Sequence, residues 1–325
     1  MKRLKRIVAL LVSAVLAVSA AGCGSTRKQA VIYTNADDEA VTAIKNALDN
    51  NGYKGQYVLQ TFGTSELGGK LLAEGTNMEA DLITMSSFYI DSAQDEKNMF
   101  QDLTFARETL SPYASYYTPI TCQEGAIIIN TDALAKEGLA KPSSIKDLAK
   151  PEYSGKISIP DIAGSSTGWL LVQDVLSAYG GDEAKNVMQG ILKNAGPHLE
   201  SSGSGPIKKV RSGEVPIAFG LRHQAVRDKN DGLPIDYIDP AEGNFSLTES
   251  VAVVDHGEST NPLAMEIAEC IIKNGRAELL KTYPMPVYVG ETADAGIMSK
   301  NPKTFREPLT VGLLSEHKIF VDGCR

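Results

Sequence analysis

Short apolar runs alternate with amphipathic stretches along the first third of the chain. The runs have the length and composition of buried strands, and the amphipathic stretches have the spacing of helices. Strands that alternate with helices favour a largely parallel sheet covered on both faces, whose ligands bind beyond the carboxyl ends of the strands. The predicted elements are a strand over 31–34, a helix over 37–48, a strand over 56–60, a helix from 64 to 75 and a strand over 81–85.

The middle of the chain continues this pattern and predicts a second α/β unit. A continuous apolar strand over 125–131 opens the unit, and a strand over 250–254 returns the chain to the first one. We therefore expect an α/β protein of two domains. The first domain comprises residues 30–124 and 246–325, and the second comprises residues 125–245. The other predicted elements are a capped short helix over 142–148, a strand over 157–159, helices over 169–179, 206–213 and 261–274, and a strand over 216–219.

The N-terminus carries the pattern of an export signal. Four basic residues within 1–6 precede an uncharged apolar run over 7–18, and small residues lead to Cys23. This pattern predicts a lipoprotein signal peptide over 1–22, lipidation of Cys23 and a tether over 23–29. The protein is then exported and lipid-anchored at the outer face of the cytoplasmic membrane. The alternatives are an ordinary cleaved signal or an uncleaved anchor helix, for which the apolar run is short of the ~20 residues needed.

Charge and cysteine usage narrow the classes of partner. The chain has 32 basic and 40 acidic residues, and four of the basic ones lie in the predicted signal peptide. An acidic body makes nucleic acid an unsuitable partner, although a local pocket of backbone N–H groups still binds an anion. Cys122, Cys270 and Cys324 do not have the spacing of a metal motif, and the four histidines are scattered. We therefore expect no metal and no cofactor.

Four junctions between strands and helices are dense in serine, threonine and glycine, and lie at 61–65, 86–87, 164–169 and 201–206. Hydroxyls and free N–H groups at positive helix ends suit an anion. The same residues also serve as ordinary helix caps and turns. Their recurrence in both halves of the chain favours a ligand shared between the domains. The candidate residues are Thr64, Ser65, Ser86, Ser87, Ser165, Ser166, Thr167, Ser202, Gly203 and Ser204.

Charged candidates accompany these loops. Arg222 and His223 follow the predicted strand over 216–219, and a guanidinium there suits phosphonate or carboxylate oxygens. A surface arginine and a packed histidine are the alternative. Asp37, Glu124 and Glu249 lie at strand ends or domain crossings, where a carboxylate holds an ammonium group or serves as a solvated or helix-capping residue.

The runs at 130–134, 142–148, 151–157, 164–168 and 202–206 together resemble the solute-binding proteins of ABC importers. The resemblance is to the branch that includes ferric-ion, putrescine-like and 2-aminoethylphosphonate binders. It implies a type II periplasmic-binding-protein fold, with the solute enclosed between two domains by hinge closure. It also implies a monomer without enzymatic activity that delivers its solute to membrane permease subunits.

The resemblance is less specific for the solute. Ferric-ion binders of this kind typically present adjacent tyrosines after the strand that corresponds to 216–219, where this chain has Leu221, Arg222 and His223. The segments 33–39 and 220–224 resemble 2-aminoethylphosphonate binders, which makes that zwitterion the preferred solute. The alternatives are a ferric-iron-binding protein, a solute sensor, and a surface phosphoester or phosphonate hydrolase with His223 as base. No Gly-x-Ser-x-Gly elbow supports the hydrolase.

Overall fold

The computed structural model describes residues 28–325. The predicted signal peptide, Cys23 and most of the predicted tether lie outside these residues. Within 28–325, no helix has both the length and the apolar character required to cross a membrane.

The strands are β1 (Ala30–Thr34), β2 (Tyr57–Thr61), β3 (Leu82–Ser86), β4 (Tyr117–Asn130), β5 (Ile157–Pro160), β6 (Leu199–Glu200), β7 (Ile217–Leu221), β8 (Ile235–Ile238), β9 (Asn244–Val253) and β10 (Pro302–Lys303). The α-helices are α2 (Asp38–Asn50), α3 (Thr64–Glu74), α4 (Ser87–Lys97), α5 (Thr131–Glu137), α6 (Ser166–Ala178), α7 (Gly181–Ala195), α8 (Gly205–Ser212), α9 (Arg222–Asn230), α10 (Pro262–Cys270), α11 (Arg276–Thr282) and α12 (Val311–Asp322).

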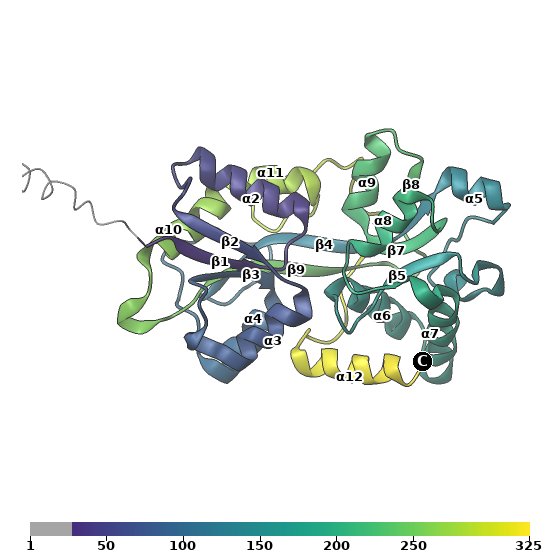
Figure 1. Cartoon of the computed structure of the whole chain (residues 1–325), viewed down its shortest axis with the longest axis horizontal. Helices are drawn as coiled ribbons and strands as arrows, with labels where there is room; N and C mark the ends of the chain where they lie inside the picture. The colour runs from purple at the N-terminus through teal and green to yellow at the C-terminus, as the bar shows by residue number, and fades with distance from the viewer. Residues whose placement is uncertain (1–27) are drawn as a thin grey trace, which may run out of the picture.

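The strands described form one sheet whose middle consists of two antiparallel strands, β4 and β9. Beyond β9 lie β3, β1 and β2, and beyond β4 lie β7, β5 and β6. Figure 1 shows α2, α3, α4, α10 and α11 around the first group of strands, and α5 to α9 around the second. The fold is therefore α/β as predicted. We refer to the two groups as the first and the second domain.

Strand β4 changes its pairing partner halfway along its length. Tyr117 to Glu124 pair with β9, and Gly125 to Ile129 pair with β7. A Cβ atom at Gly125 would lie 2.5 Å from the Phe219 ring, so the close approach of the two strands requires glycine there. The change of partner coincides with the predicted boundary between residues 124 and 125. It supports that boundary, which stays a prediction.

Most of the predicted elements are present, and the differences have local causes. The strand predicted over 125–131 is the end of the longer β4, which starts at Tyr117 because residues 117 to 124 pair with β9. The segment 142–148 does not form an α-helix. The Asp147 carboxylate accepts the backbone N–H groups of Ser143 and Ser144, and only a 3-10 turn over Lys146–Ala149 follows. Asn261, the first residue of the helix predicted over 261–274, caps α10 by accepting the Leu263 N–H.

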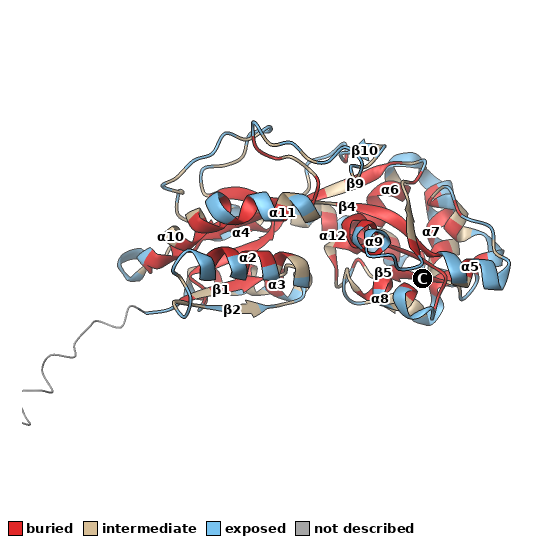
Figure 2. Ribbon diagram, turned by 90° about the horizontal axis from the view of Figure 1, so that it is seen from above, coloured by how far each residue is buried: buried red, intermediate tan, exposed pale blue. Residues whose placement is uncertain are grey.

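Helix α12 contacts both domains. Trp169 of α6, which is fully buried, donates its indole N–H to Nδ1 of His317 in α12 at 2.8 Å. The same indole packs edge-on against Phe88 of α4, with the ring centroids 4.9 Å apart. Figure 2 shows buried residues concentrated along the central strands and the inner helix faces. The C-terminal helix, predicted as part of the first domain, therefore packs on the second domain as well.

Candidate functional site

A cleft with a volume of about 380 Å³ lies between the two domains. The starts of α2 and α3 approach it from the first domain, and the starts of α6 and α8 approach it from the second. Since helix N-termini carry free N–H groups and partial positive charge, this arrangement suits an anionic group. Nine of the predicted site residues line the cleft, namely Asp37, Thr64, Ser165, Ser166, Thr167, Ser202, Gly203, Ser204 and Glu249.

Two hydroxyl-rich loops form the wall on the second domain. Ser165 caps α6, and its hydroxyl accepts the Thr167 N–H at 3.2 Å. Ser204 precedes α8 without a capping hydrogen bond from its side chain, which leaves its hydroxyl available to a ligand. A Cβ atom at Gly203 would lie 2.2 Å from Thr167 Oγ1, so the absence of a side chain there lets the two loops touch. The two loops therefore present one continuous surface of donors.

Asp37 is the first carboxylate on the opposite wall. It caps α2 by accepting the Ala40 N–H at 3.1 Å, and its Oδ2 lies 3.0 Å from His223 Nε2 of the second domain. The Tyr283 hydroxyl also donates to it. Burial opposes ionisation, but the His223 and Tyr283 contacts outweigh it and hold the pKa of Asp37 below its usual value. Asp37 is therefore an anion bonded across the cleft.

Glu249 of β9 is the second carboxylate, and its side chain is almost fully buried. Burial raises the pKa of Glu249 to about 7, against the opposing effect of the hydrogen bonds from Ser86 and Asn35. Ser86 Oγ donates at 2.7 Å, and the Asn35 amide bridges Glu249 and Thr64 when its nitrogen faces Glu249 Oε2 at 3.0 Å. A ligand ammonium group beside Glu249 would favour its ionised form.

The domains touch at two edges of the cleft. On one edge, Ser65 Oγ donates to the Ala163 carbonyl at 2.7 Å. On the other, Arg227 pairs with Glu39 at 2.9 Å next to the contact between Asp37 and His223. Ser65 and His223 therefore hold the edges together rather than line the cleft. Hydrogen bonds and ion pairs therefore join the two domains at both edges of the cleft in this structure.

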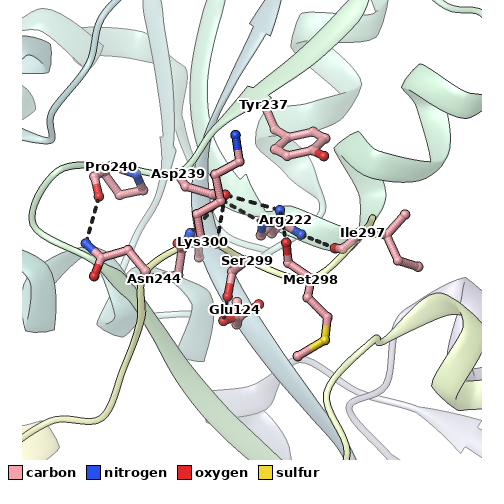
Figure 3. Close-up of polar contacts among 12 residues, drawn as sticks. Glu124, Arg222, Tyr237, Asp239, Pro240, Asn244, Ile297, Met298, Ser299 and Lys300 are labelled. Atoms are coloured by element: carbon pink, nitrogen blue, oxygen red, sulfur yellow. Dashed lines mark hydrogen bonds and ion pairs between the residues drawn. The ribbon is translucent and has the colours of Figure 1, made fainter. Parts of the chain in front are cut away.

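Arg222 was predicted to bind the acidic part of the ligand, and the structure places it elsewhere (Figure 3). Its guanidinium pairs with Asp239, with Nε 2.6 Å from Oδ1, and Nη1 and Nη2 donate to the carbonyls of Ile297 and Met298. The side chain is 2% exposed and lies over the Tyr237 ring. The prediction was wrong because this local carboxylate and two carbonyls use the donors of Arg222.

Three other predicted residues also lie outside the cleft. Glu124 accepts the Ser299 hydroxyl in the region of Arg222, as Figure 3 shows. Ser86 is fully buried and reaches the cleft only through Glu249. Ser87 bonds to the Thr248 carbonyl and the Ser250 hydroxyl on the far face of β9. Their positions at a strand end or a domain crossing were recognisable from the sequence, but the direction of each side chain was not.

The cleft also contains residues that are not among the predicted site residues. Asn35 and Phe62 directly follow β1 and β2, so the rule that ligands bind beyond strand ends applied to them. Gln123 faces the cleft from β4. Lys208 of α8 is exposed, lies at the cleft beside the loop 202–204 and supplies the positive charge that was expected of Arg222. Among the described residues lining the cleft, it is the one lysine or arginine.

Asp37, Glu39 and His223 have ligand atoms within 4.8 Å of one another, a spacing that suits a metal ion. These atoms already bond to other groups, since Asp37 contacts His223 and Tyr283, and Arg227 pairs with Glu39. Tyr116 and Tyr117 both donate to Asp91 behind the central strands, away from the cleft. The geometry therefore favours an ion-pair network here over a metal centre.

Comparison with known proteins agrees with this fold and cleft. The family model described as bacterial extracellular solute-binding protein matches residues 79–304, and the chain belongs to this family. Proteins of this family bind small molecules, work with ABC permeases and are not enzymes.

Three known proteins illustrate the range of solutes. The chain is 25% identical over 198 residues to the spermidine/putrescine-binding periplasmic protein of Escherichia coli (strain K12), covering 53% of each chain. It is 29% identical over 157 residues to the Fe(3+)-binding periplasmic protein of Serratia marcescens, covering 46% of this chain and 45% of that one. The matches thus span about half the length of these relatives. The periplasmic binding protein AfuA of Actinobacillus pleuropneumoniae, solved with fructose-6-phosphate bound, has a TM-score of 0.71 at 18% identity, covering 92% of this chain and 98% of that one. This likeness shows the two-domain fold of periplasmic binding proteins.

Proposed function

We propose that the cleft captures a small zwitterion with an anionic head and an ammonium group, and that 2-aminoethylphosphonate is the preferred solute. The observation that carries this proposal is the division of charge across the cleft. Helix N-termini and hydroxyls line both walls, but Lys208 lies on the second domain, whereas the carboxylates Asp37, Asp38 and Glu249 all lie on the first. Phosphonate oxygens then accept hydrogen bonds from the loops 165–167 and 202–204, and the ammonium group lies toward the carboxylates.

The whole protein acts, in this proposal, as the lipid-anchored capture subunit of an ABC importer. Cys23 keeps a monomeric two-domain body at the outer face of the cytoplasmic membrane, close to its permease. The domain limits remain 30–124 with 246–325, and 125–245. The solute binds the closed form more tightly than the open form, and this difference in affinity shifts the equilibrium towards the closed form. His223 bonds to Asp37 rather than to a serine, which leaves the hydrolase alternative without an activated nucleophile.

The test is a calorimetric panel with the mature body and 2-aminoethylphosphonate, ethylphosphonate, β-alanine, putrescine and ferric citrate. We expect 2-aminoethylphosphonate to bind more tightly than ethylphosphonate, which lacks the amine, and than putrescine, which lacks the anion. Ferric citrate should leave the protein colourless. Selective binding of putrescine, or a coloured ferric complex, would contradict the proposal.

A pair of variants on one helix tests the anion wall. Ser204→Ala removes a hydroxyl at the start of α8 and should weaken phosphonate binding by about 10-fold to 100-fold, as expected for a lost hydrogen bond to a charged group worth ~1.5–3 kcal/mol. Ser212→Ala removes a hydroxyl at the other end of α8, where it donates to the Lys209 carbonyl, and should leave the affinity unchanged. Equal effects of the two variants would remove Ser204 from the site.

A further inference from the structure

A second cavity, of about 370 Å³, lies behind the central strands, and we call it the back pocket. Alternate residues of a strand point to opposite faces. Gln123 and Glu249 face the cleft, whereas Cys122 and Thr248, which oppose each other across β4 and β9, line the back pocket. The two cavities therefore occupy opposite faces of the same pair of strands.

The walls of the back pocket come from segments far apart in the sequence. Helix α4 and the segments 110–113 and 285–287 contribute from the first domain. The segment 304–309 contributes from the other side. It follows β10, which pairs with the start of β9 through Lys303 and Phe245. The back pocket therefore lies between elements of the first domain and a segment that is attached to the start of β9.

The chemistry of the lining selects one class of ligand. Among the described residues that line the back pocket there is a single charged side chain, Asp91, and no lysine or arginine. The hydroxyls of Tyr116 and Tyr117 donate to the Asp91 oxygens at 2.7 and 3.2 Å. A carboxylate has about four acceptor sites, so sites remain for a ligand. The remaining lining is mostly apolar side chains and hydroxyls, among them Phe88 and Leu309.

We propose that the back pocket is a second binding site, for a small organic ammonium compound with an apolar body. The ammonium group bonds to Asp91, and the apolar body packs against Phe88 and Leu309. The cavity volume is within the usual range of roughly 300–1,000 Å³ for small-molecule sites. Burial raises the pKa of Asp91, which indicates a carboxyl group whose charge would gain from a cationic partner. This site does not depend on which solute the cleft binds.

The chain contains one tryptophan, and it provides the assay. Trp169 packs on Phe88, which lines the back pocket, so an occupant should alter the emission of Trp169. The mature body is titrated with 2-phenylethylammonium and, separately, with 2-phenylethanol, which has the same apolar body without the charge. We expect a saturable change with the amine and binding at least 10-fold weaker with the alcohol. This comparison requires no variant.

Two matched variants then locate the amine. Asp91→Asn removes the charge and should weaken amine binding at least 10-fold, measured by calorimetry on protein whose melting temperature shows that it is folded. Glu96→Gln removes a charge further along α4 from an exposed position and should bind the amine as the unaltered protein does. The proposal would be overturned by equal affinities for amine and alcohol, or by no saturable change. Amine binding that survives Asp91→Asn would assign the amine to the carboxylates of the cleft and would also overturn it.

Discussion

Glu249 gives the sharpest quantitative prediction, because its pKa is moved by burial from its usual 4.5 to about 7. A carboxyl group whose pKa is raised in the folded state stabilises the fold below pH 4.5, and this contribution is lost as the pH rises through 7. Each tenfold change in an equilibrium is about 1.4 kcal/mol. The shift therefore corresponds to about 3 kcal/mol of folding free energy that the solute-free protein lacks at about pH 8. The near-complete burial of Glu249 keeps solvent screening of this figure small.

The variant Glu249→Gln cannot ionise and retains hydrogen-bonding groups for Ser86 and Asn35. Urea denaturation of the solute-free variant should show about 3 kcal/mol more stability than the unaltered protein at about pH 8, and almost no difference at about pH 4. Glu258→Gln, at an exposed position, is the control and should show no such dependence on pH. A variant with the same stability difference at both pH values, or one that is less stable at pH 8, would refute the reasoning.

Two further variants test the parts assigned to Arg222 and Gly203. Arg222→Ala leaves the buried Asp239 carboxylate unpaired and should cost about 3–5 kcal/mol in urea denaturation, while the folded fraction keeps its calorimetric affinity for the solute. A lower affinity at unchanged stability would instead indicate that Arg222 binds the solute in the cleft. Gly203→Ala forces a Cβ atom against Thr167 and displaces the loop 202–204, which should lower solute affinity at least ~5-fold in calorimetry, because overpacking costs about 1–3 kcal/mol. The control Gly180→Ala, whose Cβ would meet no atom within 4 Å, should retain full affinity.

The pattern of apolar and polar residues was sufficient to predict the fold class, because amphipathic helices bury one face and strands such as β3 and β7 are buried on both. The start of α2 at Asp38 and the extent of α3 follow from local capping and glycine positions. The length of β4 was not predictable in this way. Pro119 interrupts its apolar run, and the strand persists there only because β9 supplies a partner, with an irregular register beside that proline.

The hydroxyl-rich loops of the cleft were predictable from the sequence, but the basic side chain that lines it was not. Hydroxyl loops at strand ends were found because their backbone position alone brings them to the cleft. Arg222 occupies such a position too, but its long side chain turns to Asp239, which lies 17 residues further along the chain. Tyr283 reaches Asp37 from 246 residues away. Contacts of this kind depend on side-chain direction and on the tertiary fold, which spacing in the sequence does not specify.

Because the two cavities lie on opposite faces of β4 and β9, we expect binding in one to affect binding in the other. In the structure the cleft edges are in contact through Ser65 and Ala163, and the back pocket is present in the same conformation. A compound that binds the back pocket better in this conformation than in the open one must favour closure by that difference in binding free energy. Linkage then requires it to raise the affinity of the cleft for its solute by the same factor, and the solute to raise the affinity of the back pocket. Calorimetric titration of each site with and without the other ligand measures this common factor, and a factor of one would contradict coupling of the two sites through closure. In this proposal, bending of the two shared strands would couple the sites without any contact between their ligands.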